Sequence, residues 1–555
     1  MPVKTYSSAI AEKISHARSL ETSYKGASIK TVPELLEKRS GKREKYLIYI
    51  DQVDQRFTLT YLEFGKMVHG MASYMVSKGL KKGDKVATIS HNHWQTVIIY
   101  FAAWLAGLVV VPVNLGEDDR RIGFILGDAH VKLAFVHRDY VDRVEKIKKQ
   151  SKMIKDLKTE IYGGSLETFL NHANSVKLPE VNGETDALLV YTSGTTGNPK
   201  GVLLTQANLL EDAHAIAWWH LITEDTRMMC VLPIHHVNGT VATLITPFYA
   251  GGSVVLNEKF RVNRFFGVIV EEHVHVVSAV PTLLRYLTNA YTRNELPGMA
   301  ELRHIICGGG PLTIKAVADF EDMFGIPVIH GYGLSETTCY SCFMPVELLP
   351  DDHRRWMRDY GYPSIGVPLS VNEMEIHDKR GEPVKEGRRG EIVIRGLNVL
   401  KEYYNNPEAN KESFANGWFR SGDEGFYTTD NKNRRYFFIT GRLKEIIIRG
   451  GVNLAPLEID EIINKVPGVE EGIAVGFENE WYGEEVGAYV KMKPGVKRDP
   501  LVILSFCEQY LPFSKCPKVV VFADEIPVTP TGKYKRMELA SFFETWKSTQ
   551  FRKLR

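Results

Sequence analysis

Short runs of apolar, β-branched residues recur along the first two-thirds of the chain, and amphipathic stretches separate them. Such runs are typical of strands buried on both faces of a parallel sheet, and the stretches between them are typical of helices. The pattern therefore predicts an α/β fold, with strands at residues 85–90, 108–113, 133–137, 187–192, 252–256, 274–280, 303–307 and 327–332.

The pattern changes after about residue 365, where short alternating segments are separated by turn signals. This change predicts a small β-barrel-like subdomain over residues 365–441. Residues 442–555 have a helix-and-strand rhythm of their own, which is typical of a small α+β domain. We expect a large N-terminal domain over residues 1–441, with two sheets in an αβαβα-type arrangement, followed by a mobile C-terminal domain.

An uncharged stretch from Val86 to Gly116 is long enough to raise the question of a membrane span. Its punctuation instead favours a buried helix over Trp94–Ala106, ended by Gly107, and then a buried strand. The polar turn His91-Asn92-His93 precedes this helix. We therefore expect no transmembrane segment, while peripheral contact with a membrane stays open.

Composition narrows the picture further. The 555 residues include 69 Lys and Arg against 67 Asp and Glu, so the net charge of +2 provides no field for nucleic acid. The six cysteines are scattered, unlike a secreted disulfide framework, and the first residues lack the apolar segment of a signal peptide. A cytoplasmic location is the expectation, and the oligomeric state stays open.

The strongest chemical signal is TSGTTGNPKG at Thr192–Gly201, directly after a buried apolar run. Its small and hydroxyl residues expose backbone N–H groups and hydroxyls, and Lys200 adds a positive charge. Phosphate oxygens need such a set of donors. The loop is not the usual mononucleotide P-loop, because Gly201 follows Lys200 where that motif has Ser or Thr.

Together with six further segments, this loop resembles the adenylate-forming enzymes. That family includes acyl-CoA synthetases, aryl-CoA ligases, peptide-synthetase adenylation domains and beetle luciferases. The further segments, in the same order, are LPIHHVNG (232–239), CGGGPL (307–312), GYGLSET (331–337), GWFRSGD (417–423), GRLKEIIIRGGVNLAP (441–456) and PVTPTGK (527–533). The resemblance implies an AMP-forming carboxylic acid–CoA ligase that uses ATP, Mg²⁺ and coenzyme A.

The resemblance also implies where ATP binds. Tyr332 would stack on adenine, and Asp423 would accept hydrogen bonds from the ribose hydroxyls beside Arg442. Thr195 and Glu336 would ligate Mg²⁺, a hard cation that prefers oxygen. The full implied set is Thr192, Ser193, Gly194, Thr195, Thr196, Gly197, Lys200, Gly308, Gly309, Gly310, Gly331, Tyr332, Gly333, Thr337, Asp423 and Arg442.

For catalysis, the resemblance implies that Lys533 bridges the α-phosphate and the substrate carboxylate. The first half-reaction needs charge neutralisation and no general base, because a carboxylic acid is ionised at neutral pH. The resemblance further implies a hinge at Lys444, about which the C-terminal domain rotates between half-reactions. Gly450 and Gly451 would then line the thiol tunnel.

The resemblance implies an acyl pocket formed by His236, Asn238, Ala242, Ile306, Gly309 and Cys339, with His236 acting as its gate. This uncharged, mainly apolar set favours a fatty or aryl acid. Residues 236–239 contain no acidic residue, which argues against an amino acid substrate.

Neighbouring pairs of possible metal ligands are not predicted to bind metal. No third ligand is apparent for His235-His236 or His273-x-His275, and Cys339-x-x-Cys342 lacks a second pair. His273 and His275 are expected to pack on one face of a strand.

Two alternative functions stay open. One is a stand-alone enzyme that loads an acyl-carrier protein, and the other is a non-catalytic nucleotide- or lipid-binding sensor. The absence of an insertion after Asp423 favours CoA as the acceptor. The joint presence of Lys533, Glu336, Asp423 and Arg442 favours catalysis.

Overall fold

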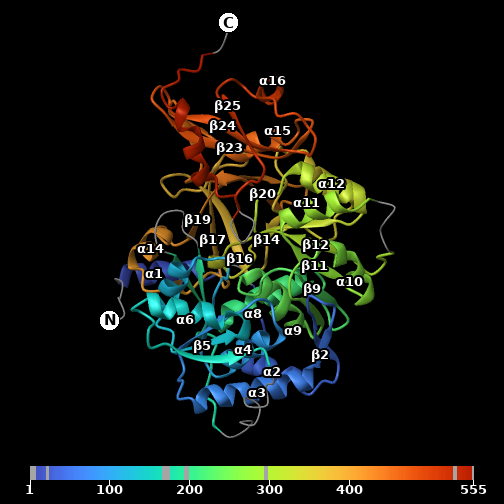
Figure 1. Cartoon of the computed structure of the whole chain (residues 1–555), viewed down its shortest axis with the longest axis vertical. Helices are drawn as coiled ribbons and strands as arrows, with labels where there is room; N and C mark the ends of the chain where they lie inside the picture. Colours follow the sequence, from blue (N-terminus) through green and yellow to red (C-terminus); the bar gives the residue numbers. More distant parts are fainter. Residues whose placement is uncertain are drawn as a thin grey trace.

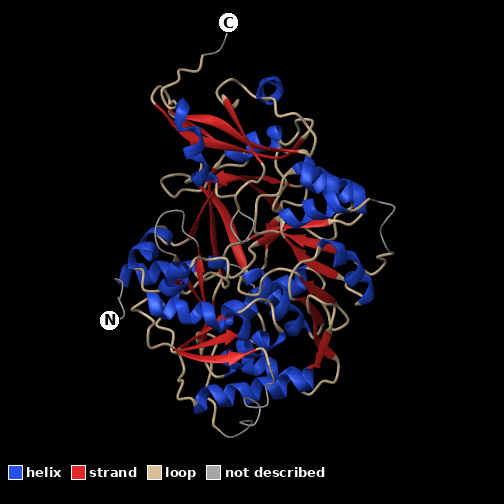
Figure 2. Ribbon diagram, viewed as in Figure 1, coloured by secondary structure: helices blue, strands red, loops and turns tan. Residues whose placement is uncertain are grey.

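The computed structural model describes residues 8–20, 24, 26–164, 176–192, 199–292, 298–528 and 534–552. This part of the chain is built on four β-sheets, and helices cover and separate the two largest (Figures 1 and 2). The carboxyl-terminal segment, red in Figure 1, forms the upper end of the molecule.

The largest sheet brings together strands from distant parts of the sequence. Strand β1 pairs in parallel with β10, so the N-terminal hairpin of β1 and β2 lies at one edge. In spatial order the sheet consists of β15 (Val367–Pro368), β14 (Cys342–Phe343), β13 (Val328–Tyr332), β12 (His304–Cys307), β11 (Val276–Ala279), β9 (Arg227–Cys230), β10 (Ser253–Asn257), β1 (Lys45–Ile50) and β2 (Arg56–Thr60).

The second large sheet carries the start of the predicted phosphate loop. Its strands β7 and β8 are antiparallel, and residues 193–198 lie between them. In spatial order the sheet consists of β18 (Glu402–Tyr403), β8 (Lys200–Thr205), β7 (Asp186–Thr192), β4 (Val109–Pro112), β3 (Lys85–Ile89), β5 (Leu133–His137) and β6 (Lys158–Tyr162).

The α/β prediction is confirmed, because the predicted apolar runs form β3, β4, β5, β7, β10, β11, β12 and β13. The long helices are α1 (Ser8–Ala17), α2 (Val32–Arg39), α3 (Tyr61–Ser77), α4 (Trp94–Leu105), α5 (Asp119–Asp128), α6 (Val141–Gln150), α8 (Gln206–Trp219), α10 (Phe265–Glu271), α11 (Pro281–Ala290), α12 (Ile314–Phe324) and α13 (Pro350–Arg358).

The uncharged stretch folds as the punctuation predicts. Helix α4 is almost wholly buried, and Gly107 follows it with a φ of 66°, which glycine adopts without strain. The Trp104 indole N–H donates to the Ala187 carbonyl at 2.8 Å, which satisfies its one polar group in the core. Within the described ranges, no helix combines the length and apolar character that crossing a bilayer requires.

The two smaller sheets follow. The β-rich segment after residue 365 is a four-stranded antiparallel sheet of β16 (Asn372–His377), β17 (Gly390–Gly396), β19 (Phe419–Thr429) and β20 (Arg435–Arg442), next to α14 (Pro407–Ser413). The last sheet contains β22 (Val452–Leu454), β21 (Ile447–Arg449), β24 (Gly483–Met492), β23 (Val469–Asn479) and β25 (Val519–Ala523), with α15 (Pro456–Ile463), α16 (Pro500–Tyr510) and the 3-10 segment η6 (Arg536–Trp546).

Candidate active site

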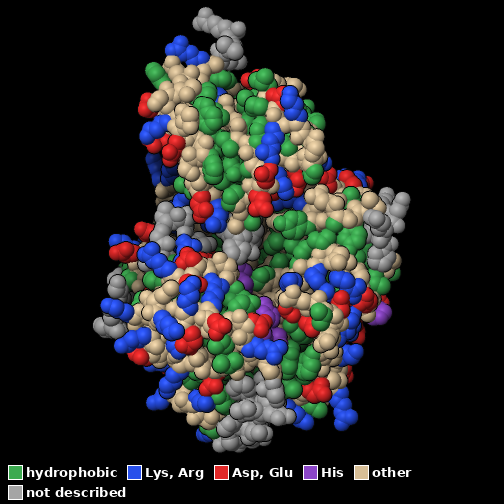
Figure 3. Space-filling model, viewed as in Figure 1, with side chains coloured by type: hydrophobic (Ala, Val, Ile, Leu, Met, Phe, Trp, Pro, Cys, Tyr) green, Lys and Arg blue, Asp and Glu red, His purple; other side chains and the backbone are tan. Residues whose placement is uncertain are grey.

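A cavity lies where the four-stranded sheet and the loops of the nine-stranded sheet meet the C-terminal segment. In the space-filling view, the surface is hollowed between the C-terminal segment, at the upper end, and the rest of the molecule below it (Figure 3). The C-terminal segment contributes Asp460, Glu461, Tyr534 and Arg536 to the lining. From the predicted nucleotide site, the lining includes Gly309, Gly310, Gly331, Tyr332, Gly333, Asp423 and Arg442.

Asp423 is the centre of a polar cluster in this cavity. Strands β19 and β20 place Asp423 opposite Arg442, whose Nε lies 2.9 Å from Asp423 Oδ1. The Tyr332 hydroxyl, at the end of β13, donates to Asp423 Oδ2 at 2.7 Å. Burial, followed by the negative charge of Asp423, raises the pKa of Tyr332. Because a buried carboxylate needs such partners, the fold holds one strong hydrogen-bond acceptor where the ribose hydroxyls are expected.

Glu336 and Lys200 meet at Tyr403, a residue that the sequence did not single out. The Tyr403 hydroxyl donates to Glu336 Oε1 at 2.9 Å, and the Lys200 ammonium lies 5.3 Å from the centre of the Tyr403 ring. Strand β18 carries Tyr403 to the edge of β8, where Lys200 begins. Glu336, the predicted Mg²⁺ ligand, and Lys200, the predicted phosphate-binding cation, therefore both contact the Tyr403 side chain.

A strained turn connects the nucleotide motif to the predicted acyl pocket. Thr338 has φ 66° and ψ −61°, and the Cys339 N–H donates to the Thr337 carbonyl at 2.7 Å. These values define a γ-turn, which is rare for a β-branched residue. Thr338 Oγ1 donates to the Asn398 carbonyl at 2.6 Å and helps to hold the turn.

Other predicted residues lie outside the described part of the chain. These are Ser193, Gly194, Thr195, Thr196 and Gly197 of the phosphate loop, together with Lys533. Their neighbours are described: Thr192 ends β7, and Tyr534 lines the cavity. Gly308 also lies near the cavity, where a Cβ would meet the Gly331 carbonyl at 2.7 Å, so only glycine fits there.

The residues predicted for the acyl pocket surround one hydrogen-bonded chain. Ser278 Oγ donates to Asn238 Oδ1 at 2.7 Å, and Asn238 Nδ2 donates to the Tyr340 hydroxyl at 2.8 Å. Strand register places Ile306 beside Ser278, and Cys339 contacts the backbone of Ala242. Asn238 begins a π-helix over Asn238–Ile245, a conformation frequent at functional sites that the sequence did not predict.

Two buried groups behind this pocket were missed from the sequence. Tyr340 is 2% exposed, and Asp212 on α8 is fully buried. Asp212 accepts hydrogen bonds from the Tyr340 N–H at 3.2 Å and from Asn398 Nδ2 at 3.1 Å. Burial raises the pKa of Asp212 to about 8. Asp212 lies in a mainly buried helix, and no sequence motif around it indicates a functional residue. Its partners, Tyr340 and Asn398, are distant in sequence and only the fold brings them close.

The histidine pairs differ in their environments. His235 and His236 are partly buried with ring centres 4.4 Å apart, and burial lowers the pKa of His235 well below its usual value. The prediction that His273 packs on a strand face is wrong. His273 precedes β11 with a φ of 52°, and its exposed ring contacts Glu301. His275 also lies just before β11, but it is partly buried and its Nδ1 accepts from the Arg227 N–H at 3.0 Å.

The C-terminal segment is anchored to the large domain close to Tyr534. Arg285 on α11 donates to the Tyr534 hydroxyl at 3.0 Å and forms an ion pair with Glu471. The Tyr534 hydroxyl donates to Glu471 Oε1 at 2.7 Å. At a second contact, Glu461 on α15 accepts from the Ile314 N–H at the start of α12, at 2.9 Å.

The predicted hinge and tunnel residues lie away from these anchors. Lys444 is exposed between β20 and β21, directly after the end of the four-stranded sheet. Gly450 and Gly451 form the β21–β22 turn with φ values of 56° and 81°. Neither glycine is among the described residues that line the cavity. In this orientation the segment with Tyr534, and not the glycine turn, faces the nucleotide site.

Comparison with known proteins agrees with this geometry. The family model of the AMP-binding enzyme matches residues 36–404, and that of the AMP-binding enzyme C-terminal domain matches residues 458–533. Sulfoacetate–CoA ligase from Cupriavidus necator is 33% identical over 494 residues, covering 88% of this chain and 94% of that protein. The long-chain-fatty-acid–CoA ligase FadD13 from Mycobacterium tuberculosis is 30% identical over 514 residues, covering 91% and 97%.

Solved structures give the same result. The ATP-bound structure of MatB from Rhodopseudomonas palustris is 25% identical, with a TM-score of 0.82 over 93% of this chain and 99% of that one. The fold and cavity together define an adenylate-forming enzyme. The chain belongs to the AMP-binding enzyme family, and its class is that of AMP-forming acid–thiol ligases, which use ATP and CoA.

The contact between Glu461 and Ile314 predicts a pH-dependent domain interface. Burial raises the pKa of Glu461 from 4.5 to about 8, and among the described residues its buried Oε2 has no hydrogen-bond partner. The docked state therefore binds a proton that an exposed glutamate releases, so docking weakens as pH rises from about 4.5 to 8 and then levels off.

Hydrogen exchange at the Ile314 amide, corrected for its intrinsic rate, measures this effect. We expect protection in the wild-type protein to decrease over this pH range, and protection in Glu461→Gln to stay nearly constant. If the protection of the Ile314 amide in Glu461→Gln still depended on pH as in the wild-type protein, a titrating group other than Glu461 would cause that dependence.

Proposed function

We propose that the chain activates a compact carboxylic acid with MgATP and transfers its acyl group to CoA. The substrate carboxylate attacks the α-phosphorus of ATP and pyrophosphate leaves, which gives an acyl-adenylate. The CoA sulfur then attacks the acyl carbon, loses its proton, and AMP leaves. The observation that carries the proposal is the cluster of Asp423, Arg442 and Tyr332 at a cavity that the C-terminal segment closes.

In the first half-reaction, these groups have distinct roles in the proposal. Asp423 and Arg442 hold the ribose, and rotation of the Tyr332 ring onto adenine frees Asp423 Oδ2 for a ribose hydroxyl. Glu336 and Thr195 would hold Mg²⁺, which would neutralise phosphate charge, and Lys200 with the residues from Thr192 to Gly197 would contact the outer phosphates. The adjacent Tyr534 lines the cavity, which supports a place for Lys533 at the α-phosphate.

For the second half-reaction, we propose rotation of the C-terminal domain about Lys444. The contacts of Tyr534 and Glu461 hold the orientation suited to adenylation. Rotation would break these contacts, withdraw Lys533, and bring Gly450 and Gly451 to the cavity, where the thiol must enter. His236 would then separate the acyl pocket from the thiol path.

Tyr340 supports a compact acid within the fatty or aryl class expected from the sequence. Its ring fills the space behind Gly308, where a Cβ would lie 2.8 Å from a ring carbon of Tyr340. Its hydroxyl accepts a hydrogen bond from Asn238 Nδ2, so in the proposal the acyl pocket would end at polar groups. The relatives act, by name, on sulfoacetate and on long-chain fatty acids, so their names do not choose between these sizes.

Replacing Tyr340 with alanine should shift the acid preference toward longer substrates. Each additional buried methylene contributes about 0.8 kcal/mol, so kcat/KM for octanoate relative to propionate should rise by roughly 10-fold or more. Tyr340→Phe is the matched control, because it keeps the ring and should keep the size limit. Wild-type activity on palmitate equal to that on short acids would refute the compact pocket.

The reaction itself is tested by measuring AMP and pyrophosphate release over a panel of acids, with and without CoA. AMP release that requires both an acid and CoA is expected. If an acyl-carrier protein accepts the acyl group from the adenylate and CoA does not, the carrier protein would replace CoA as the proposed acceptor. No turnover with any acid would overturn the enzymatic proposal and favour a nucleotide-binding sensor.

A further inference from the structure

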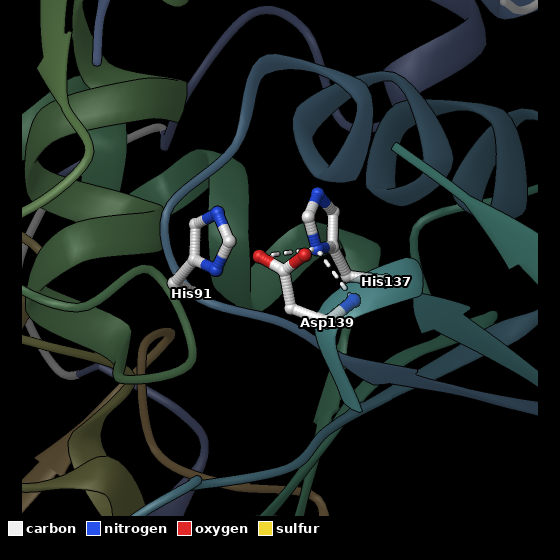
Figure 4. Close-up of side chains that lie close together, drawn as sticks. All are labelled: His91, His137 and Asp139. Atoms are coloured by element: carbon white, nitrogen blue, oxygen red, sulfur yellow. Dashed lines mark hydrogen bonds and ion pairs between the residues drawn. The ribbon is translucent and has the colours of Figure 1, made fainter. Parts of the chain in front are cut away.

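A second cluster of chemically active side chains lies apart from the nucleotide cavity. His91 follows β3 and His137 ends β5, and these two strands are parallel neighbours. Their carboxyl ends meet at one edge of the sheet, and Asp139 follows in the short 3-10 segment after β5 (Figure 4). One potential ligand atom from each of the three side chains lies within 4.8 Å of the other two.

The spacing within the cluster is close to that of a metal site. His137 Nδ1 lies 3.3 Å from Asp139 Oδ2, and the Asp139 carboxylate lies between the two imidazole rings in Figure 4. Zinc bonds to nitrogen and oxygen of about 2.0–2.2 Å in a tetrahedron put ligand atoms about 3.3 Å apart. One edge of the tetrahedron therefore already has its length. Metal binding would replace the hydrogen bond that His137 Nδ1 accepts from the Asp139 N–H at 3.4 Å and the contact of His91 Nδ1 with the Tyr140 hydroxyl at 3.3 Å, and the His91 side chain would rotate toward the other two ligands.

The surroundings suit a bound cation. The His137 side chain is 5% exposed, while that of Asp139 is 56% exposed, so the site has a dry inner side and an open outer side for water. Glu258 Oε1 lies 4.0 Å from His91 Nε2 and would have to move closer to accept the ring N–H when Nδ1 binds a metal. Ligand histidines commonly donate their second N–H to a carboxylate in this way. The glycine at position 163 leaves room for the His137 ring, since a Cβ there would lie 2.5 Å from Nε2.

We propose that His91, His137 and Asp139 form a binding site for a transition-metal dication such as Zn²⁺, with water as the fourth ligand. Imidazole nitrogen with a single carboxylate favours such metals over Mg²⁺ or Ca²⁺.

The site would brace the loop that supports the acyl pocket. Next to His91, the Asn92 side chain donates to the Leu232 and Asn257 carbonyls and accepts from the Ile234 N–H. Bound metal would therefore fix the segment that leads to His236, which gives the site a structural role that does not depend on the proposed reaction.

Metal titration of the purified full chain tests this site. The protein is treated with EDTA, dialysed, and titrated without nucleotide, using Zn²⁺ against a chromophoric chelator and Co²⁺ by visible absorption. We expect one equivalent of tight binding, a rise in Tm with Zn²⁺, and d–d bands of tetrahedral Co²⁺. His91→Ala and Asp139→Asn should each weaken binding by about 10-fold or more.

His273→Ala is the matched control, because His273 is an exposed histidine beside Glu301 at a distant position. It should bind like the wild-type protein. Asp139→Asn removes the charge from an exposed side chain and guards against a folding defect, which circular dichroism checks. Binding in His91→Ala and Asp139→Asn equal to that of the wild type, or no stoichiometric binding in the wild type, would overturn the proposal.

Discussion

Replacing Lys533 with alanine is expected to slow acyl-adenylate formation by about 10²–10³-fold, the usual cost of losing one placed charge on a developing anion. Thioester formation from supplied acyl-adenylate should stay close to the wild-type rate. The reason is that, in the proposed reaction, the lysine ammonium neutralises two approaching anions in the first step only. The neighbouring Tyr534 is held by Arg285 and Glu471, so the residue that follows Lys533 is fixed at the cavity.

The two half-reactions are measured separately, as pyrophosphate release and as CoA thioester formation from synthetic adenylate. Lys535→Ala is the matched control, since Lys535 lies two residues on and its ammonium is 3.4 Å from Glu538. That variant should keep both activities. Equal losses in the two halves for Lys533→Ala would contradict the assigned role.

Replacing Asp423 with alanine is expected to lower kcat/KM for ATP by about 10²–10³-fold, or ~3–4 kcal/mol. The variant removes the proposed acceptor for the ribose hydroxyls and leaves the Arg442 guanidinium and the Tyr332 hydroxyl without their shared partner. The KM for the acid at saturating ATP should change much less, because the Asn238 chain lies apart from this carboxylate.

Isothermal titration with AMP separates binding from stability. Asp430→Ala serves as the control, because Asp430 pairs with Arg434 at 2.8 Å in the same sheet, near the turn between β19 and β20. We expect Asp430→Ala to lower Tm and to keep AMP affinity, and Asp423→Ala to lose affinity. Wild-type affinity in Asp423→Ala would remove Asp423 from the nucleotide site.

Much of the fold could be predicted because parallel strands buried on both faces leave a direct trace in sequence. The runs that became β3, β5 and β12 are almost wholly apolar, and no polar alternation competes with that signal. Strand pairing between distant segments leaves no such trace. The pairing of β18 with β8, which brings Tyr403 to Lys200, depends on tertiary packing alone.

In the candidate site, too, some features could be predicted from the sequence and others depend on tertiary structure. Asp423, Arg442 and Tyr332 belong to ordered motifs, and the fold brings them within hydrogen-bonding distance. Tyr340 lies three residues after such a motif, but its proposed role at the end of the acyl pocket depends on a strained turn at Thr338. His91 and His137 are far apart in the sequence, and only the parallel pairing of β3 with β5 makes them neighbours.

Because β1 pairs with β10, one edge of β1 has no partner until about residue 257 has left the ribosome. At 5–20 residues per second, synthesis of the intervening chain takes about 10–40 s. Strand β2 covers the other edge early as a local hairpin, yet the segment KYLIYI keeps an open, strongly apolar edge throughout this interval. This segment is therefore a site of possible aggregation in the nascent chain until β10 covers its open edge and places it inside the largest sheet.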